Sequence, residues 1–138
     1  MAVASSEQGL LPLSQAAFFL HGAVGRHKYD FAYGDEFEGA IASHFEGGRR
    51  AVMLEHHGLY AVGTSAADAW FVVFHLHQAC EVQLRAQSAG QPLVMPPKEH
   101  LEAQYLDMMS SPDYAYDGSR EWAGCVRKLN RELPGYEA

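Results

Sequence analysis

Residues 51–63 have the sequence AVMLEHHGLYAVG, and the predicted architecture is built around them. Two apolar, strand-like runs flank the polar triplet Glu-His-His, and Thr64 and Ser65 then open a long helical pattern. The order strand, polar turn, strand, helix predicts that the turn lies at the end of a β-sheet. Histidines held at such a position have the chemistry for metal binding or proton transfer.

The histidine pair by itself leaves two interpretations open. Successive side chains of an extended chain point to opposite faces, so His56 and His57 reach one metal only if the chain bends. Gly58 permits such a bend. A metal site, however, needs three or four converging ligands. The plainer interpretation is a buried strand whose histidines bond to backbone carbonyls.

Length and composition indicate a single folded domain. A chain of 138 residues with 48% hydrophobic residues is large enough to bury a core and too apolar for disorder. The net charge of −7 argues against a nucleic-acid partner. The first residues lack the features of a signal peptide, and no apolar segment approaches the roughly 20 residues that cross a bilayer. We therefore expect a cytoplasmic protein without a membrane partner.

The two cysteines, Cys80 and Cys125, lie far apart and form no CxxC spacing. This pattern predicts free, buried thiols in a reducing compartment and gives no sign of a cysteine-based zinc site.

The pattern after residue 63 predicts a buried central helix that starts at Thr64 as N-cap and runs to about Ser88. His75 and His77 are two positions apart on this helix and point in different directions, so we do not expect them to share a metal. His77 falls on the expected buried stripe and is interpreted as a core or interface residue. That stripe consists of Ala66, Ala69, Trp70, Val73, His77, Cys80 and Leu84.

The remaining elements follow from shorter patterns. Residues 1–8 are interpreted as the tail of a helix capped by Gly9, which implies further sequence upstream. A short helix through Leu20, a strand from Tyr29 through Tyr33 and a helix from Glu36 capped by Asp35 come next. Two further helices are expected at residues 98–109 and 119–133.

Three blocks resemble the class II aldolase/adducin family, with its adducin-like branch as the closer match. GLLPLSQ at residues 9–15 resembles the GLLP[IL]S segment of the family, and residues 52–63 resemble its HHG block. Residues 67–84 are similar to the helix that follows. The resemblance implies an α/β fold in which helices sandwich a mixed β-sheet, the α/β/α arrangement of class II aldolases. It also implies that residues 1–138 form one partial domain, the C-terminal portion, with the N-terminal part missing.

The resemblance also implies roles for particular residues. In metal-dependent members the histidine directly before the glycine of the HHG or NHG segment is a zinc ligand, which corresponds to His57. His56 stands where many members have asparagine and is the less favoured ligand. Tyr29 lies near a family tyrosine that acts as a proton donor in some aldolases, and a core strand tyrosine is the alternative. The other ligands of the family, an HxH pair, lie upstream and are absent from this chain.

For a complete relative, the resemblance implies divalent-metal-dependent aldol cleavage, or related enediolate chemistry, of a small and often phosphorylated sugar. We expect zinc as the metal and a homo-oligomer, a tetramer in the family. One ligand does not make a zinc site, so the isolated chain is expected to be inactive as a lyase. The alternative is a non-catalytic, adducin-like module for oligomerisation or interaction, so enzymatic activity stays open.

Overall fold

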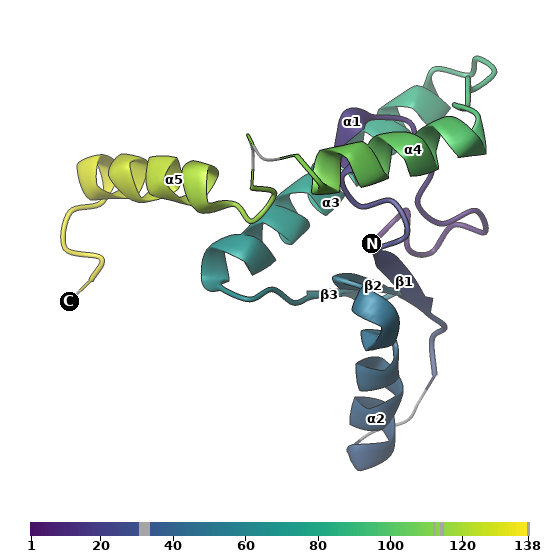
Figure 1. Cartoon of the computed structure of the whole chain (residues 1–138). Coiled ribbons are helices and arrows are strands. Elements are labelled where there is room, and N and C mark those ends of the chain that lie inside the picture. The colour runs from purple at the N-terminus through teal and green to yellow at the C-terminus, as the bar shows by residue number, and fades with distance from the viewer. Residues whose placement is uncertain (31–33, 112, 114, 138) are drawn as a thin grey trace.

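The computed structural model describes residues 1–30, 34–111, 113 and 115–137. Its helices lie on both sides of a mixed sheet, which confirms the expected fold class (Figure 1). The elements are α1 (Gln15–Phe18), β1 (Val24–His27), α2 (Asp35–Ser43), the 3-10 helix η1 (Glu46–Gly48), β2 (Ala51–Leu54), β3 (Gly58–Ala61), α3 (Ala66–Ser88), α4 (Lys98–Met109) and α5 (Ser119–Glu132).

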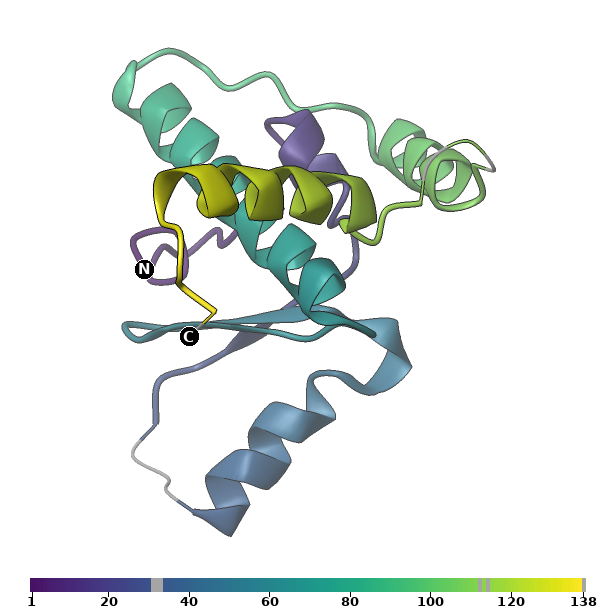
Figure 2. The same ribbon diagram turned by 90° about the vertical axis from the view of Figure 1, so that its left-hand side faces the viewer.

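The sheet has the strand order β1-β2-β3. β1 runs parallel to β2, with His27 opposite Leu54, and β3 returns antiparallel, with Gly58 opposite Leu54. The carboxyl ends of β1 and β2 therefore lie at the same end of the sheet as the turn at residues 55–57. α3 lies above the sheet and α2 below it (Figure 2). The predicted order of strand, polar turn, strand and helix is confirmed.

The central strand β2 is buried on both faces, because each face packs on a different helix layer. Ala51 and Met53 join α3 residues in the larger core cluster. Val52 and Leu54 face the other way and pack with Ile41 of α2 in the smaller one. The larger cluster consists of Val3, Ala4, Leu20, Ala51, Met53, Val72 and Leu76.

The face that α3 buries differs from the expected one. His77 is exposed, with 72% of its side chain accessible, whereas His75 is buried. The first half of this helix is apolar almost all round, so periodicity did not identify the side that packs on the sheet. The buried residues of α3 are Asp68, Phe71, Val72, His75, Leu76, Ala79 and Gln83.

α3 begins one residue later than expected. Its N-cap is Ser65, whose Oγ accepts a hydrogen bond from the Asp68 N–H at 3.1 Å, rather than Thr64. The Asp68 carboxylate turns back and accepts from the Thr64 N–H at 2.9 Å. Two backbone donors at the helix start are thus satisfied by side chains, in an arrangement that differs from a capping box because the second donor belongs to Thr64, the residue before the N-cap.

Gln83 anchors the segment with the GLLP sequence to α3. Its side chain is fully buried; Oε1 accepts from the Leu11 N–H and Nε2 donates to the Gly9 carbonyl, each at 2.8 Å. One amide therefore satisfies a donor and an acceptor of a buried loop.

Three local expectations were wrong. Residues 1–8 form turns rather than a helix, although Gly9 has the positive φ of 65° expected at a cap. The strand lies at 24–27, so Tyr29 follows it; Phe31 and Tyr33 lie outside the described residues. Gly34, not Asp35, caps α2.

The two cysteines are free, as predicted. Cys80 is half-buried, and burial raises the pKa of its thiol. Cys125 is exposed, contrary to the expectation that both are buried. None of the helices in the described ranges combines the length and apolar character needed to cross a membrane.

Candidate functional site

The turn at residues 55–57 carries the two candidate histidines. His56 has a φ of 59° and is the only non-glycine residue with a positive φ in the described part of the chain. Its N–H donates to Ser5 Oγ at 3.0 Å, and the His57 N–H donates to the Leu54 carbonyl at 3.3 Å. The expected bend is therefore made at His56 rather than at Gly58. Left-handed backbone at a residue with a Cβ costs energy and is often found at functional sites.

Glu55 fastens this turn to β1. Its Oε1 lies 2.8 Å from Arg26 Nη2, and its Oε2 accepts from the Tyr29 N–H at 3.3 Å. The Glu55 N–H donates to the His27 carbonyl at 3.0 Å. Arg26 Nη1 also donates to the Glu7 carbonyl at 2.9 Å, so the N-terminal segment is held at the same edge.

Tyr29 and His56 lie together on the surface. Their ring centroids are 5.9 Å apart at an interplanar angle of 73°. Half of Tyr29 is exposed, so it is not a core strand tyrosine. His56 and His57 are both exposed, so the interpretation of buried histidines is wrong as well. The arrangement brings Tyr29, Glu55 and His56 into one cluster, with His57 beside it in the chain.

These residues do not complete a metal site. Across the described ranges, no group of three or more His, Cys, Asp or Glu side chains could hold a metal ion. His57 offers an exposed imidazole, and a catalytic zinc site needs three protein ligands. The donor set is therefore insufficient for zinc without ligands from elsewhere.

A second histidine pair, which the sequence patterns did not indicate, lies on the α2 side of the sheet. His27 Nδ1 and His44 Nε2 are 3.1 Å apart, and their rings are nearly perpendicular. His27 Nε2 lies 3.2 Å from the Asp30 carboxylate. The two histidines are 17 positions apart, and only the return of α2 towards β1 brings them together.

The pair predicts a loss of stability in acid. Burial, followed by the proximity of His27 and then of Arg49, lowers the pKa of His44 from its usual 6.5. The folded state then binds fewer protons than the unfolded chain, so stability rises with pH between the lowered pKa and 6.5. We expect the free energy of unfolding to fall as the pH drops below about 6.5. Urea titrations at a series of pH values around and below 6.5 measure this free energy of unfolding.

His44→Gln should flatten this part of the pH profile, because the pair then carries one imidazole fewer. His100→Gln changes an exposed histidine on α4 and serves as the control. An unchanged pH slope in His44→Gln would contradict the prediction.

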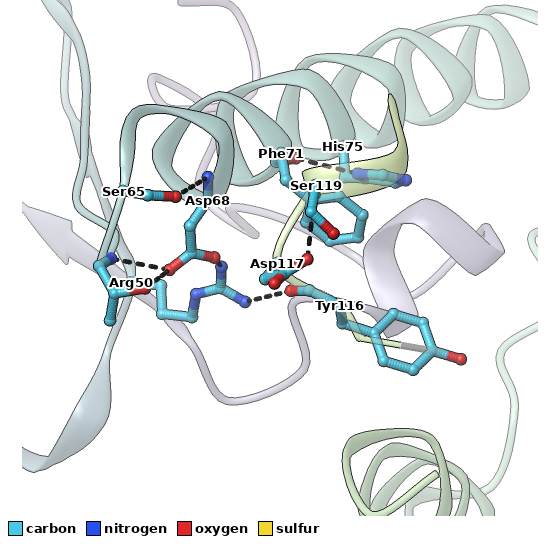
Figure 3. A network of polar contacts seen from close by, with 9 residues as sticks. Arg50, Ser65, Asp68, Phe71, His75, Tyr116, Asp117 and Ser119 are labelled. Carbon is cyan, nitrogen blue, oxygen red and sulfur yellow. Dashed lines mark hydrogen bonds and ion pairs between the residues drawn. The ribbon is translucent and has the colours of Figure 1, made fainter. Parts of the chain in front are cut away.

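A buried ion pair joins the start of β2 to the start of α3 (Figure 3). Arg50 Nη2 bonds to Asp68 Oδ1, and Arg50 Nη1 lies 3.5 Å from the Tyr116 carbonyl. The same view shows Asp117 Oδ1, which accepts from the Ser119 N–H at 3.0 Å at the start of α5. This network is structural, because its members bond to backbone groups and to each other.

His75 is also a structural residue. Its Nδ1 bonds to the Phe71 carbonyl at 2.9 Å, and its ring packs against those of Phe19, Phe71 and Phe74. Burial lowers the pKa of this imidazole, which favours the neutral form.

A cavity of about 340 Å³ lies between the GLLP segment, α1 and β1. Leu10, Pro12, Leu20 and Met53 are among its lining residues, whereas the histidines of the turn are not. The cavity is therefore separate from the candidate site.

Comparison with known proteins identifies relatives among both the class 2 aldolases and the adducins. The family described as "Class II Aldolase and Adducin N-terminal domain" matches residues 1–84. This range does not support the expectation that the chain is the C-terminal portion of the family domain. A putative aldolase class 2 protein of Pseudomonas aeruginosa is 35% identical over 139 residues, covering 99% of this chain and 53% of that protein. Alpha-adducin of Rattus norvegicus is 39% identical over 93 residues, covering 66% of this chain and 12% of that protein.

Solved structures agree with the sequence relatives. The crystal structure of an aldolase II superfamily protein from Pseudomonas syringae aligns with a TM-score of 0.85 and 30% identity, over 99% of this chain and 55% of that one. L-fuculose 1-phosphate aldolase from Glaciozyma antarctica aligns with a TM-score of 0.72 and 25% identity, over 95% and 49%. The chain thus spans about half the length of the aldolase-type relatives that it matches.

Proposed function

The chain belongs to the class II aldolase and adducin family, and we propose that its residues 1–138 form part of an aldolase-type domain to which His57 contributes one metal ligand. The observation that carries this proposal is the position of His57. It is exposed in the turn where β1 and β2 end, beside Glu55 and His56. A metal ion bound to His57 at this position could also bind donor atoms from other polypeptide segments.

The proposed chemistry is aldol cleavage of a small phosphorylated sugar. A divalent ion, for which we propose zinc, would act as a Lewis acid towards the substrate carbonyl. The similarity to L-fuculose 1-phosphate aldolase supports this substrate class. Tyr29 is proposed as the proton donor, because its half-exposed phenol lies in the same cluster. We also propose that the protein forms a homo-oligomer and acts in the cytoplasm.

The zinc test uses the purified chain, His57→Ala and His77→Ala as a control on an exposed α3 histidine. We expect binding weaker than about 1 μM, because one imidazole supplies a small part of the free energy of a complete site. The residual binding should fall further in His57→Ala and stay unchanged in His77→Ala. Isothermal titration calorimetry measures it. Sub-micromolar binding would contradict the expectation that the isolated chain binds zinc weakly, and binding that His57→Ala leaves intact would refute the proposed role of His57.

A second function is an interaction module of the adducin type. The identity of 39% to alpha-adducin over 93 residues is the observation that favours it. This function predicts self-association that zinc does not alter. Sedimentation velocity with zinc and with a chelator separates the two functions, because only a ligand shared between polypeptides makes association depend on the metal.

A further inference from the structure

We propose that Glu55 is a positioning residue of the candidate site, whose carboxylate holds Tyr29 beside the turn at residues 55–57. The inference rests on the proposed function, because it concerns the spacing between the proposed proton donor, Tyr29, and the proposed metal ligand, His57. Glu55 acts through the residues that it contacts and does not itself bind the metal or the substrate.

The backbone ladder between β1 and β2 ends at Glu55. The Glu55 N–H donates to the His27 carbonyl at 3.0 Å. In a parallel pair one residue bonds to the two residues that flank its partner, so a continued ladder would join the Tyr29 N–H to the Glu55 carbonyl. The Tyr29 N–H donates instead to Oε2 of the Glu55 side chain, at 3.3 Å. The carboxylate thus takes the place of the main-chain acceptor and extends the alignment of the two segments beyond the strands.

The ladder stops because the chain turns at His56. This residue has a φ of 59°, a left-handed conformation that a residue with a Cβ keeps only where its surroundings hold it. The His56 N–H donates to Ser5 Oγ at 3.0 Å, which holds the turn from one side. Glu55 comes directly before the left-handed residue and joins the turn to Tyr29 on the other side.

The second carboxylate oxygen of Glu55 completes a closed ring of contacts. Oε1 lies 2.8 Å from Arg26 Nη2, and Arg26 Nη1 donates to the Glu7 carbonyl at 2.9 Å. Ser5, two residues before Glu7, accepts from the His56 N–H, so the contacts return to the turn. Because the carboxylate is held from two sides, its side chain is restricted to one orientation, as a residue that positions others requires.

The consequence of these contacts is the ring pair of Tyr29 and His56. The two ring centroids lie 5.9 Å apart at 73°, within the range of favourable edge-to-face pairs. Both oxygens of Glu55 have protein partners, and its side chain is only 19% exposed. Glu55 is therefore suited to placing Tyr29 rather than to binding a ligand, and correct placement of a reacting group contributes strongly to catalysis.

Nuclear magnetic resonance of the metal-free chain tests this role. Glu55→Gln keeps the size of the side chain but turns an amide N–H₂ group towards either Arg26 or the Tyr29 N–H, both of which are donors. Tyr29→Leu removes the tyrosine ring outright and so calibrates its effect on the ring signals of His56. We expect Glu55→Gln to shift these signals by at least about half as much as Tyr29→Leu does, because the edge-to-face pair is lost.

The matched control is Glu81→Gln, which removes a carboxylate from the ion pair with Arg85 on α3. This substitution should leave the His56 ring signals where they are in the parent chain.

Two substitutions of Arg26 decide the matter if Glu55→Gln does not fold, because they leave Glu55 and Tyr29 in place. Arg26→Gln removes the charge that holds Oε1, so it should shift the His56 signals in the same direction as Glu55→Gln. Arg26→Lys keeps a positive charge for the carboxylate and should shift them less than half as far, on the order of a partial rescue.

Zinc titration separates positioning from ligation. Glu55→Gln should leave the zinc affinity within about threefold of the parent value, because the imidazole of His57 is unchanged. A failure of the proposed metal role appears only in the titrations of the parent chain and His57→Ala, so it is distinguishable from a failure of positioning. Unshifted His56 signals in Glu55→Gln and Arg26→Gln, equal shifts in Glu81→Gln, or a loss of zinc affinity as large as that of His57→Ala would overturn the proposal.

Discussion

Asp68→Ala is expected to lower the free energy of unfolding by about 3–5 kcal/mol, the usual cost of removing one partner from a buried ion pair. The Arg50 side chain is 17% exposed and would keep its charge without the carboxylate. Arg50 Nη1 also lies 3.5 Å from the Tyr116 carbonyl, which does not neutralise a guanidinium.

The same substitution weakens the start of α3. Asp68 accepts hydrogen bonds from the Thr64 N–H and hydroxyl, at 2.9 and 3.2 Å. Loss of these acceptors leaves a donor before the first turn unsatisfied, which adds to the cost. The Arg50–Asp68 pair joins the start of β2 to the start of α3. The effect should therefore appear in cooperative unfolding of the whole chain.

Urea denaturation measures the Asp68 effect, and Glu81→Ala is the matched control. Glu81 forms an ion pair with Arg85 on the exposed side of the same helix, with side chains 47% and 78% accessible. Exposed pairs contribute about 0–1 kcal/mol. A loss of unfolding free energy below about 1 kcal/mol for Asp68→Ala, or equal losses for the two variants, would show that the buried ion pair does not stabilise the junction of β2 with α3.

Gln83→Leu is expected to cost about 2–4 kcal/mol. The substitution keeps a side chain of similar size but removes both partners of the GLLP segment, the acceptor for the Leu11 N–H and the donor for the Gly9 carbonyl. Each buried polar group left without a partner costs about 1–3 kcal/mol. Because Gln83 is fully buried, water cannot replace these bonds without disrupting the packing.

Thermal and urea unfolding measure the effect of Gln83→Leu, with Gln87→Leu as the control. Gln87 lies one turn later on α3 and is exposed, with a weaker contact of 3.4 Å to Gln8 Oε1. We expect a change below about 0.5 kcal/mol for the control, as for most surface substitutions. Equal stability of Gln83→Leu and the parent chain would contradict the anchoring role.

Much of the architecture was predictable because its signals are local. Two apolar runs around a polar triplet predicted β2, the turn and β3, and the capping residues after residue 63 predicted the start of α3 within one residue. Lys98 to Met109 is helical as expected. In each case neighbouring residues determine the backbone conformation without help from distant parts of the chain.

The failed predictions involve tertiary packing. The buried side of α3 is set by the sheet, and a helix that is apolar all round does not reveal it. Arg50 and Asp68 are 18 positions apart, and Gln83 is 72 positions from Leu11. No spacing rule connects such residues before the fold is known. The backbone at His56 was missed because glycine is the usual residue with positive φ, and Gly58 stood nearby.

The candidate site was predictable only in part. The pattern of residues placed two histidines at the end of the sheet, and the family resemblance selected His57 as a ligand. The exposure of both histidines is compatible with that role. The cluster of Tyr29, Glu55 and His56 depends on the parallel pairing of β1 with β2, which the sequence did not specify.

X-ray absorption at the zinc edge tests the central claim most directly, because it counts the imidazoles bound to each ion. The protein is loaded with zinc at high concentration, alongside His57→Ala. Our account predicts one imidazole per zinc, with oxygen ligands in the other positions, and loss of that imidazole in His57→Ala. Three imidazoles on one zinc ion, or an imidazole signal that survives His57→Ala, would contradict it, because the ligands would then come from elsewhere in this chain.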